Sequence, residues 1–144
     1  MTYLSDYPVT VERNLEWGDM DAMGHVNNII YFRFFENARI AYFHKTCVND
    51  QLKDTGIGPI LKSTSSVYRV PLTFPDLITV GAKVTKLDTD RFTMKYAVYS
   101  HRHQRIAAEG EGVVVLFNYW TQEKTPLSQN IIQAIKLLEP KIGD

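Results

Sequence analysis

The sequence lacks several features that would assign it to a common functional class. It contains one cysteine, Cys47, among 144 residues, which excludes an intrachain disulfide and every zinc site made of several cysteines. Neither sign of charge is in excess, since 16 basic residues balance 16 acidic ones. A nucleic-acid-binding protein usually carries a basic excess, so this balance argues against one. A glycine-rich phosphate loop and the Gly-x-Ser-x-Gly motif of serine hydrolases are also missing.

Long hydrophobic runs are missing as well. The most apolar stretch, residues 29–43, is interrupted by charged side chains and is too short to cross a bilayer. The first residues show no basic region followed by an apolar run, so no signal peptide is expected. We therefore expect one soluble, cytoplasmic domain over residues 1–144 that contacts neither membrane nor nucleic acid.

An unusually apolar helix is predicted for residues 28–44. Its polar side chains, among them Arg33, Glu36 and His44, fall on one stripe at helical spacing. The rest of its circumference is aliphatic or aromatic, so we expect a central, buried helix that other structure wraps. Glu36 can also pair with Arg39 one turn later.

The remainder of the chain is dominated by strand patterns. A first strand is predicted before the helix, at residues 9–17, and a loop after it, at residues 54–59. Four more strands are predicted at residues 61–74, 78–87, 92–101 and 106–120. An amphipathic helix at residues 128–138, with Ser128 as its N-cap, ends the pattern.

The separators between the later strands, at residues 74–76, 88–90 and 103–104, favour antiparallel hairpins. Helices and strands are segregated along the chain and do not alternate, which predicts an α+β fold with one antiparallel sheet. One sheet curled around one very apolar helix leaves edges exposed, so we expect a dimer or a larger assembly.

The densest polar cluster, residues 17–28, lies immediately before the long helix. With Asn27 as the N-cap, Asn28 is the first helical residue, and the N–H groups and dipole at such a terminus can bind a developing oxyanion. Asp21, on the preceding turn, can supply a nucleophile or a general base. The same residue types are also ordinary turn and cap residues, and we expect Asp19 to be one of these.

This segment resembles the hotdog-fold acyl thioesterases of the 4-hydroxybenzoyl-CoA thioesterase type, and within them the bacterial long-chain acyl-CoA thioesterases. The residues that carry the resemblance are 19–28 (Asp-Met-Asp-Ala-Met-Gly-His-Val-Asn-Asn), Tyr31, Phe35, Glu36, Arg39, residues 68–72 (Tyr-Arg-Val-Pro-Leu) and Asp76. The resemblance implies a long central helix wrapped by a curved antiparallel sheet. It also implies hydrolysis of acyl-CoA thioesters by a homodimer or homotetramer with active sites at the subunit interface.

The resemblance implies roles for particular residues. Asp21 matches the catalytic acid, and the backbone N–H of Asn28 polarises the thioester carbonyl. His25 matches a histidine that matters in plant acyl-carrier-protein thioesterases, which place an asparagine where this sequence has Met23. No cofactor and no metal are implied, and the substrate is an acyl-CoA or an acyl-carrier protein.

Two other functions stay open. A hotdog hydratase or dehydratase would also use an acid and a histidine, which Asp21 and His25 offer, and a non-catalytic module would bind acyl thioesters and leave them intact. For the CoA phosphates, the hairpin at residues 86–91 carries two acids where aromatic-acyl relatives have basic residues. Cations near strand ends are the candidates: Lys86, Arg91, Arg102 and Arg105.

Two further features favour ordinary structural roles. His101 and His103 lie on one side of a strand like a metal-binding pair, but a hairpin tip explains them and we expect no metal site. Cys47 follows the long helix without the surroundings of a nucleophile, so we expect a packed thiol.

Overall fold

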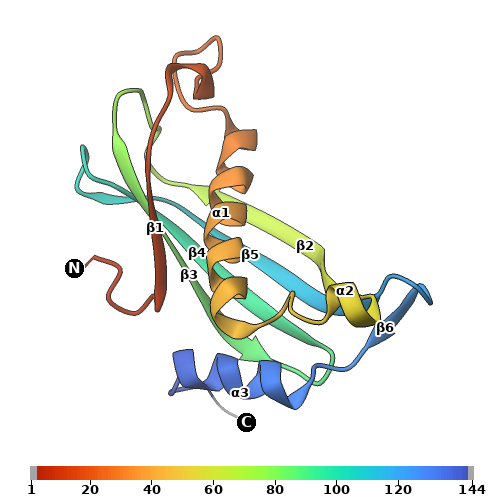
Figure 1. Cartoon of the computed structure of the whole chain (residues 1–144). Coiled ribbons are helices and arrows are strands. Elements are labelled where there is room, and N and C mark those ends of the chain that lie inside the picture. The colour runs from red at the N-terminus through yellow and green to blue at the C-terminus, as the bar shows by residue number, and fades with distance from the viewer. Residues whose placement is uncertain (1–2, 143–144) are drawn as a thin grey trace.

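A computed structural model describes residues 3–142 of the chain (Figure 1). The elements in chain order are β1 (Val9–Asn14), the 3-10 helix η1 (Trp17–Asp19), α1 (Asn28–Thr46), α2 (Leu52–Thr55), β2 (Ile57–Tyr68), β3 (Leu77–Leu87), β4 (Arg91–Ser100), β5 (Arg105–Asn118), β6 (Glu123–Thr125) and α3 (Gln129–Leu138). The six strands form one antiparallel sheet in the order β1-β3-β4-β5-β2, with β6 beside β5. This sheet curls around α1, which confirms the predicted α+β hotdog fold.

Helix α1 begins where the sequence predicts. The side-chain oxygen of Asn27 accepts a hydrogen bond from the Ile29 N–H at 3.2 Å, so it caps the first turn. On the side that faces the sheet, aromatic and small side chains are fully buried and form the core with strand residues from β3, β4 and β5. The core side chains that α1 contributes without solvent exposure are Phe34, Phe35, Ala38 and Tyr42.

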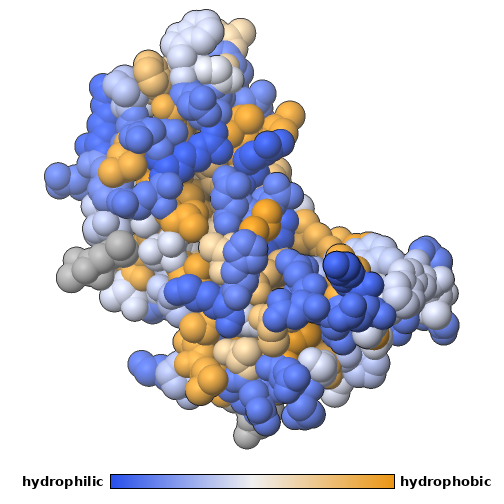
Figure 2. Space-filling view, viewed as in Figure 1, coloured by the Kyte–Doolittle hydropathy of each residue, from blue (hydrophilic) through white to orange (hydrophobic). Residues whose placement is uncertain are grey.

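The opposite side of α1 is open, which corrects the prediction of a helix wrapped all round. Ile29 is 68% exposed and Ile40 is 42% exposed, because one curled sheet covers only one side of the helix. Figure 2 shows hydrophobic side chains among hydrophilic ones on the face that carries α1. Apolar side chains left open to water along a helix favour a further contact surface.

Two sequence predictions about β2 are wrong. This strand begins at Ile57, inside the predicted loop, because an edge strand tolerates Pro59 with its missing N–H turned away from the sheet. It also ends at Tyr68, and residues 69–76 form a crossover where a hairpin was predicted. β2 pairs with β5 while β3 pairs with β1 and β4, so this segment must span the end of the sheet.

The remaining element predictions are confirmed, with shifts of a few residues at the ends. β1 is shorter than predicted because the chain turns into η1 at Trp17, and the short elements α2 and β6 were not predicted. α3 starts after Ser128, whose hydroxyl accepts from the Ile131 N–H at 3.2 Å. No helix among residues 3–142 is long and apolar enough to span a membrane.

Candidate active site

A tight turn holds the predicted acid next to the start of α1. Met20 and Val26 form an isolated antiparallel bridge, and the backbone N–H of Asp21 donates to the carbonyl of His25 at 2.9 Å. Gly24 lies at the corner with a φ of 81°, a conformation that glycine adopts without strain. The turn therefore fixes the backbone of Asp21 and leaves its carboxylate to project from the loop.

The first N–H groups of α1 are occupied except one. The N–H of Asn27 donates to the carbonyl of Asp19 at 2.9 Å. The N–H groups of Ile29 and Ile30 both donate to Asn27, at 3.2 Å to its side chain and 2.9 Å to its carbonyl. The N–H of Asn28 has no acceptor within residues 3–142, so it remains available to an external oxygen at the positive end of the helix dipole.

These groups meet at one cavity. A volume of about 400 Å³ is lined by the three predicted residues Asp21, His25 and Asn28. The facing wall comes from the end of β2 and the residues that follow it, and includes Tyr68 and Arg69. The structure thus brings together all three predicted site residues.

The two acids of the turn have different environments. Asp19 is 7% exposed, and its carboxylate accepts from the Arg13 guanidinium at 3.1 and 3.2 Å and from the Glu16 N–H at 2.9 Å. This confirms the predicted turn role of Asp19. Asp21 is exposed; one carboxylate oxygen accepts from the Met23 N–H at 2.9 Å, and the other has no partner among the described residues.

Two tyrosines form the wall beside Asn28, and sequence reasoning gave them no role. The Tyr68 hydroxyl donates to the Asn28 carbonyl at 3.0 Å, and its ring packs edge-on against Tyr31 at 4.9 Å between centroids. Burial raises the pKa of Tyr31 to about 12, so this phenol stays neutral at physiological pH and is no base. The only sequence signal for Tyr68 was its place in the matched residues 68–72.

The cations proposed for the CoA phosphates separate into two groups. Lys86 and Arg91 flank the β3–β4 hairpin near α3, where each pairs with an aspartate of that hairpin, at 3.9 and 2.9 Å. Arg102 and Arg105 lie at the opposite end of the sheet, where the Arg102 guanidinium donates to the Pro75 carbonyl at 3.4 Å. That end also carries the turn with the candidate acid, but neither arginine lines the cavity there.

The weaker sequence features have ordinary partners. The His101 ring hydrogen bonds to the Thr79 hydroxyl at 2.7 Å, and the backbone N–H of His103 donates to the Ser100 hydroxyl at 3.0 Å. Among residues 3–142, no three histidine, cysteine, aspartate or glutamate side chains come together as a metal site. Burial raises the pKa of the Cys47 thiol, which makes it a poorer nucleophile at neutral pH.

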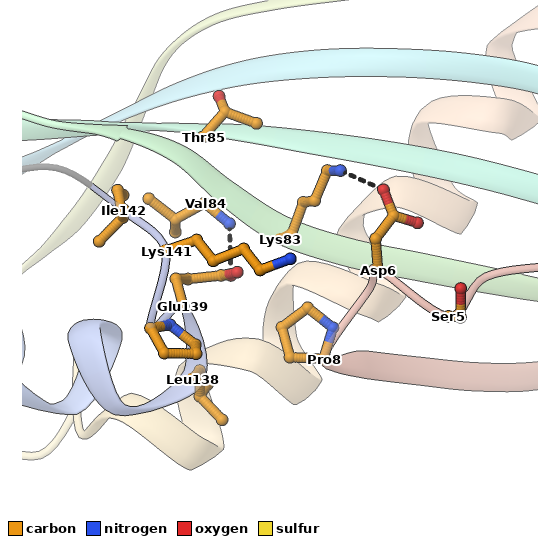
Figure 3. A pocket seen from close by; sticks show the side chains of 11 residues that line it. Ser5, Asp6, Pro8, Lys83, Val84, Thr85, Leu138, Glu139, Lys141 and Ile142 are labelled. Carbon is orange, nitrogen blue, oxygen red and sulfur yellow. Dashed lines mark hydrogen bonds and ion pairs between the residues drawn. The ribbon is translucent and has the colours of Figure 1, made fainter.

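A larger cavity, of about 550 Å³, lies at the other end of α1, between β3, the segment before β1 and the end of α3 (Figure 3). Both of its carboxylates have partners in the protein. The Glu139 carboxylate accepts from the Tyr42 hydroxyl and from the Val84 N–H, both at 2.8 Å, and Lys83 pairs with Asp6 at 2.7 Å. Unlike the cavity beside Asn28, it is not lined by the first residues of a long helix.

The family model described as the thioesterase-like superfamily matches residues 15–135 of the chain. Among solved structures, a thioesterase from Thermus thermophilus complexed with coenzyme A and zinc is 26% identical with a TM-score of 0.84, and the match covers 96% of this chain and 98% of that one. A protein of the thioesterase superfamily from Jannaschia is 23% identical with a TM-score of 0.84, covering 93% and 85% of the two chains. A 1,4-dihydroxy-2-naphthoyl-CoA thioesterase from Synechocystis is 20% identical with a TM-score of 0.80, covering 91% and 97%.

Proposed function

The chain belongs to the thioesterase-like superfamily, and we propose that it hydrolyses acyl-CoA thioesters at the cavity between Asp21 and Asn28. One observation carries the assignment of the site. The Asn28 N–H, at a helix N-terminus, is the one N–H of the first turn without an acceptor among the described residues, and it lines the same cavity as a carboxylate with a free oxygen. Together they supply an oxyanion donor and a nucleophile or base, which thioester hydrolysis requires.

The chemistry follows from these two groups. The thioester carbonyl accepts from the Asn28 N–H, which stabilises the negative charge that develops on its oxygen. Asp21 then acts in one of two ways. It either takes a proton from water, which attacks the carbonyl carbon, or attacks that carbon itself to give an anhydride that water hydrolyses. Both routes release the acid and the CoA thiol.

His25 is the third residue that we propose for the site. Its backbone carbonyl holds the turn by accepting from the Asp21 N–H, while its exposed side chain lies on the cavity wall. The backbone contact needs no particular side chain. A His25→Ala variant therefore tests the imidazole alone, and a loss of turnover without a loss of stability supports a direct part in the reaction.

We also propose a homodimer or homotetramer whose subunits join at the free edge of β2. This strand is the last in the sheet and presents unpaired backbone groups over residues 57–68. Val67 and Tyr68 are exposed near the active-site end of this edge, and Ile29 is exposed on the neighbouring helix. An exposed sheet edge with apolar side chains favours pairing with a second sheet.

The proposal is tested by thiol release from a panel of acyl-CoAs, short to long and aromatic, with wild type and Asp21→Asn. We expect release by wild type and loss of it in the variant. Conversion of enoyl or hydroxyacyl chains without thiol release identifies a hydratase or dehydratase instead. Binding without any conversion identifies an acyl-binding module, and release only from acyl-carrier protein changes the carrier in the proposal.

A further inference from the structure

A groove follows α1 away from the candidate active site. It consists of two adjoining cavities of about 300 and 260 Å³ between α1 and β2, which share Glu36, Arg39 and Leu61. The first of them starts at Ile29, next to Asn28. The groove therefore begins one residue after the helix N-terminus, where the thioester carbonyl is proposed to bind, and follows α1 as far as Phe43.

Arg39 is the most unusual group in this groove. Its side chain is 12% exposed, and it donates to the Tyr96 hydroxyl at 3.2 Å. The Glu36 carboxylate forms an ion pair with Arg39 at 4.0 Å, which confirms the pairing predicted from the sequence but is beyond hydrogen-bond distance. A guanidinium has five N–H donors, so most of those on Arg39 have no hydrogen-bond acceptor within residues 3–142. The nitrogens that carry them are not fully buried, so these N–H groups can donate to a group that enters the groove.

A further unpaired polar group lies on β2, two residues beyond Thr64 of the groove wall. The Ser66 hydroxyl is buried and has no hydrogen-bond partner among the described residues. Ser66 stands opposite Gly110 in the β2–β5 register, and the ring of Phe35 fills the space in front of Gly110. Residues directly opposite each other point to the same face of a sheet, so the Ser66 side chain projects toward the helix.

The spacing along α1 puts the two polar ends of the groove on one line. Arg39 comes eleven residues after Asn28, which is close to three full turns, so both lie on the same face about 16 Å apart along the axis. Phe32 lines the groove between them, and its ring packs edge-on against the buried Phe35 at 6.0 Å between centroids. A group that starts at Asn28 thus passes the Phe32 ring and then reaches a guanidinium.

We propose that the acyl group lies in this groove and that Arg39 determines substrate specificity by donating hydrogen bonds to an oxygen at the far end of the chain. The preferred substrates are then acyl thioesters with a terminal hydroxyl or carboxylate. A plain fatty acyl chain would place a methyl group against the guanidinium and displace its water, whereas a terminal oxygen accepts hydrogen bonds from the free N–H groups. This inference rests on the proposed thioesterase function.

The test compares kcat/KM for octanoyl-CoA, ω-hydroxyoctanoyl-CoA and the monothioester suberoyl-CoA, and for decanoyl-CoA and sebacoyl-CoA. We expect wild type to favour the oxygenated member of each set. Arg39→Met, which keeps an unbranched side chain, should lower kcat/KM for that member about 10- to 100-fold and should raise kcat/KM for the plain chain, because the methyl end then meets an apolar side chain. Arg39→Lys keeps one charged donor and should fall between the two. Preference for the hydroxyl or for the carboxylate identifies which oxygen is bound.

Lys45→Met is the control, because Lys45 is a cation of the same helix whose side chain is exposed and lines neither cavity of the groove. It should leave the preference unchanged. Equal cleavage of plain and oxygenated chains by wild type would overturn the inference and leave the thioesterase proposal standing, while thiol release from no substrate would overturn both. A uniform loss in Arg39→Met together with a smaller mass in light scattering would assign Arg39 to a subunit contact and also overturn the inference.

Discussion

The two ends of α1 each carry a carboxylate beside a cavity, and the larger cavity is at the end without the proposed chemistry. At the C-terminal end, Glu139 is half-buried and accepts two hydrogen bonds from the protein beside a cavity of about 550 Å³ (Figure 3). At the N-terminal end, Asp21 is exposed beside a cavity of about 400 Å³ and keeps one oxygen free. Reactivity depends on which groups are left unpaired, and cavity size alone is a poor guide to it.

The comparison extends to the donors around each carboxylate. The backbone N–H of Val84 donates to the Glu139 carboxylate. Pairing between β1 and β3 ends at Ala82, so this carboxylate supplies the acceptor that β1 no longer provides. The Asn28 N–H near Asp21 is left open by the fold. One end is therefore a structural junction and the other an open site, and the predictions below test this division.

The largest effect is expected for Asp21→Asn. The amide can neither accept the proton of water nor attack a thioester, so we expect kcat to fall at least about 100-fold with the free energy of unfolding nearly unchanged. Asp19→Asn is the control from the same turn. It weakens the buried contact with Arg13, so it should lower the free energy of unfolding by about 1–3 kcal/mol. Wild-type turnover in a folded Asp21→Asn protein would contradict the assignment.

The role of the Asn28 backbone is tested by Asn28→Pro. Proline is tolerated at the first helical position, and the extended Asn27, with ψ of 134°, suits a following proline. The change removes the N–H, so we expect a loss of kcat of about 100-fold with the helix retained in circular dichroism. Asn28→Ala keeps the N–H and should change kcat less than about 3-fold. Equal losses in both variants would place the oxyanion elsewhere.

The sequence predicted the start of α1 and the three site residues because their signals are local. Asn27 caps the helix within two residues, and the turn that holds Asp21 closes over five residues with Gly24 at its corner. The facing wall was not predicted, because Tyr68 reaches Asn28 across forty residues of α1, α2 and β2, and the other wall residues lie in the crossover that follows β2. That crossover was taken for a hairpin, since the separators resemble turns whichever strands they join.

The open side of α1 was missed for a related reason. Apolar side chains around most of a helix show that much of it is to be covered, but not whether the cover comes from its own chain or from a second one. Phe34 is buried by its own chain, whereas Ile40 is exposed in the single chain. If a second subunit covers Ile40, both side chains are apolar because both are buried in the assembly. Composition carries no information about which chain provides the contact.

The structural role of Glu139 predicts a loss of stability without a loss of chemistry. Glu139→Ala leaves the Tyr42 hydroxyl and the Val84 N–H without their acceptor, so the free energy of unfolding should fall by about 1–3 kcal/mol in urea titrations. Turnover per folded molecule should stay near that of wild type. Tyr42→Phe removes only one of the two donors and should cost less. A loss of kcat in folded Glu139→Ala would mean that this junction is coupled to the active site.

The smallest effect is the pH dependence of stability at this cavity, where two carboxyls shift in opposite directions. Burial raises the pKa of Glu139 above its ordinary value of 4.5, so the folded state holds this proton more tightly than the unfolded state. The stability that Glu139 contributes is then full below pH 4.5 and declines as pH rises past that value.

The hydrogen bond from Lys83 lowers the pKa of Asp6 below 3.8, so the stability due to Asp6 is present above that pH and is lost as pH falls. Relative to wild type, Glu139→Gln should therefore gain stability as pH rises and Asp6→Asn should lose it. Curves of the same sign in urea titrations from pH 3 to pH 7 would contradict the proposed environments.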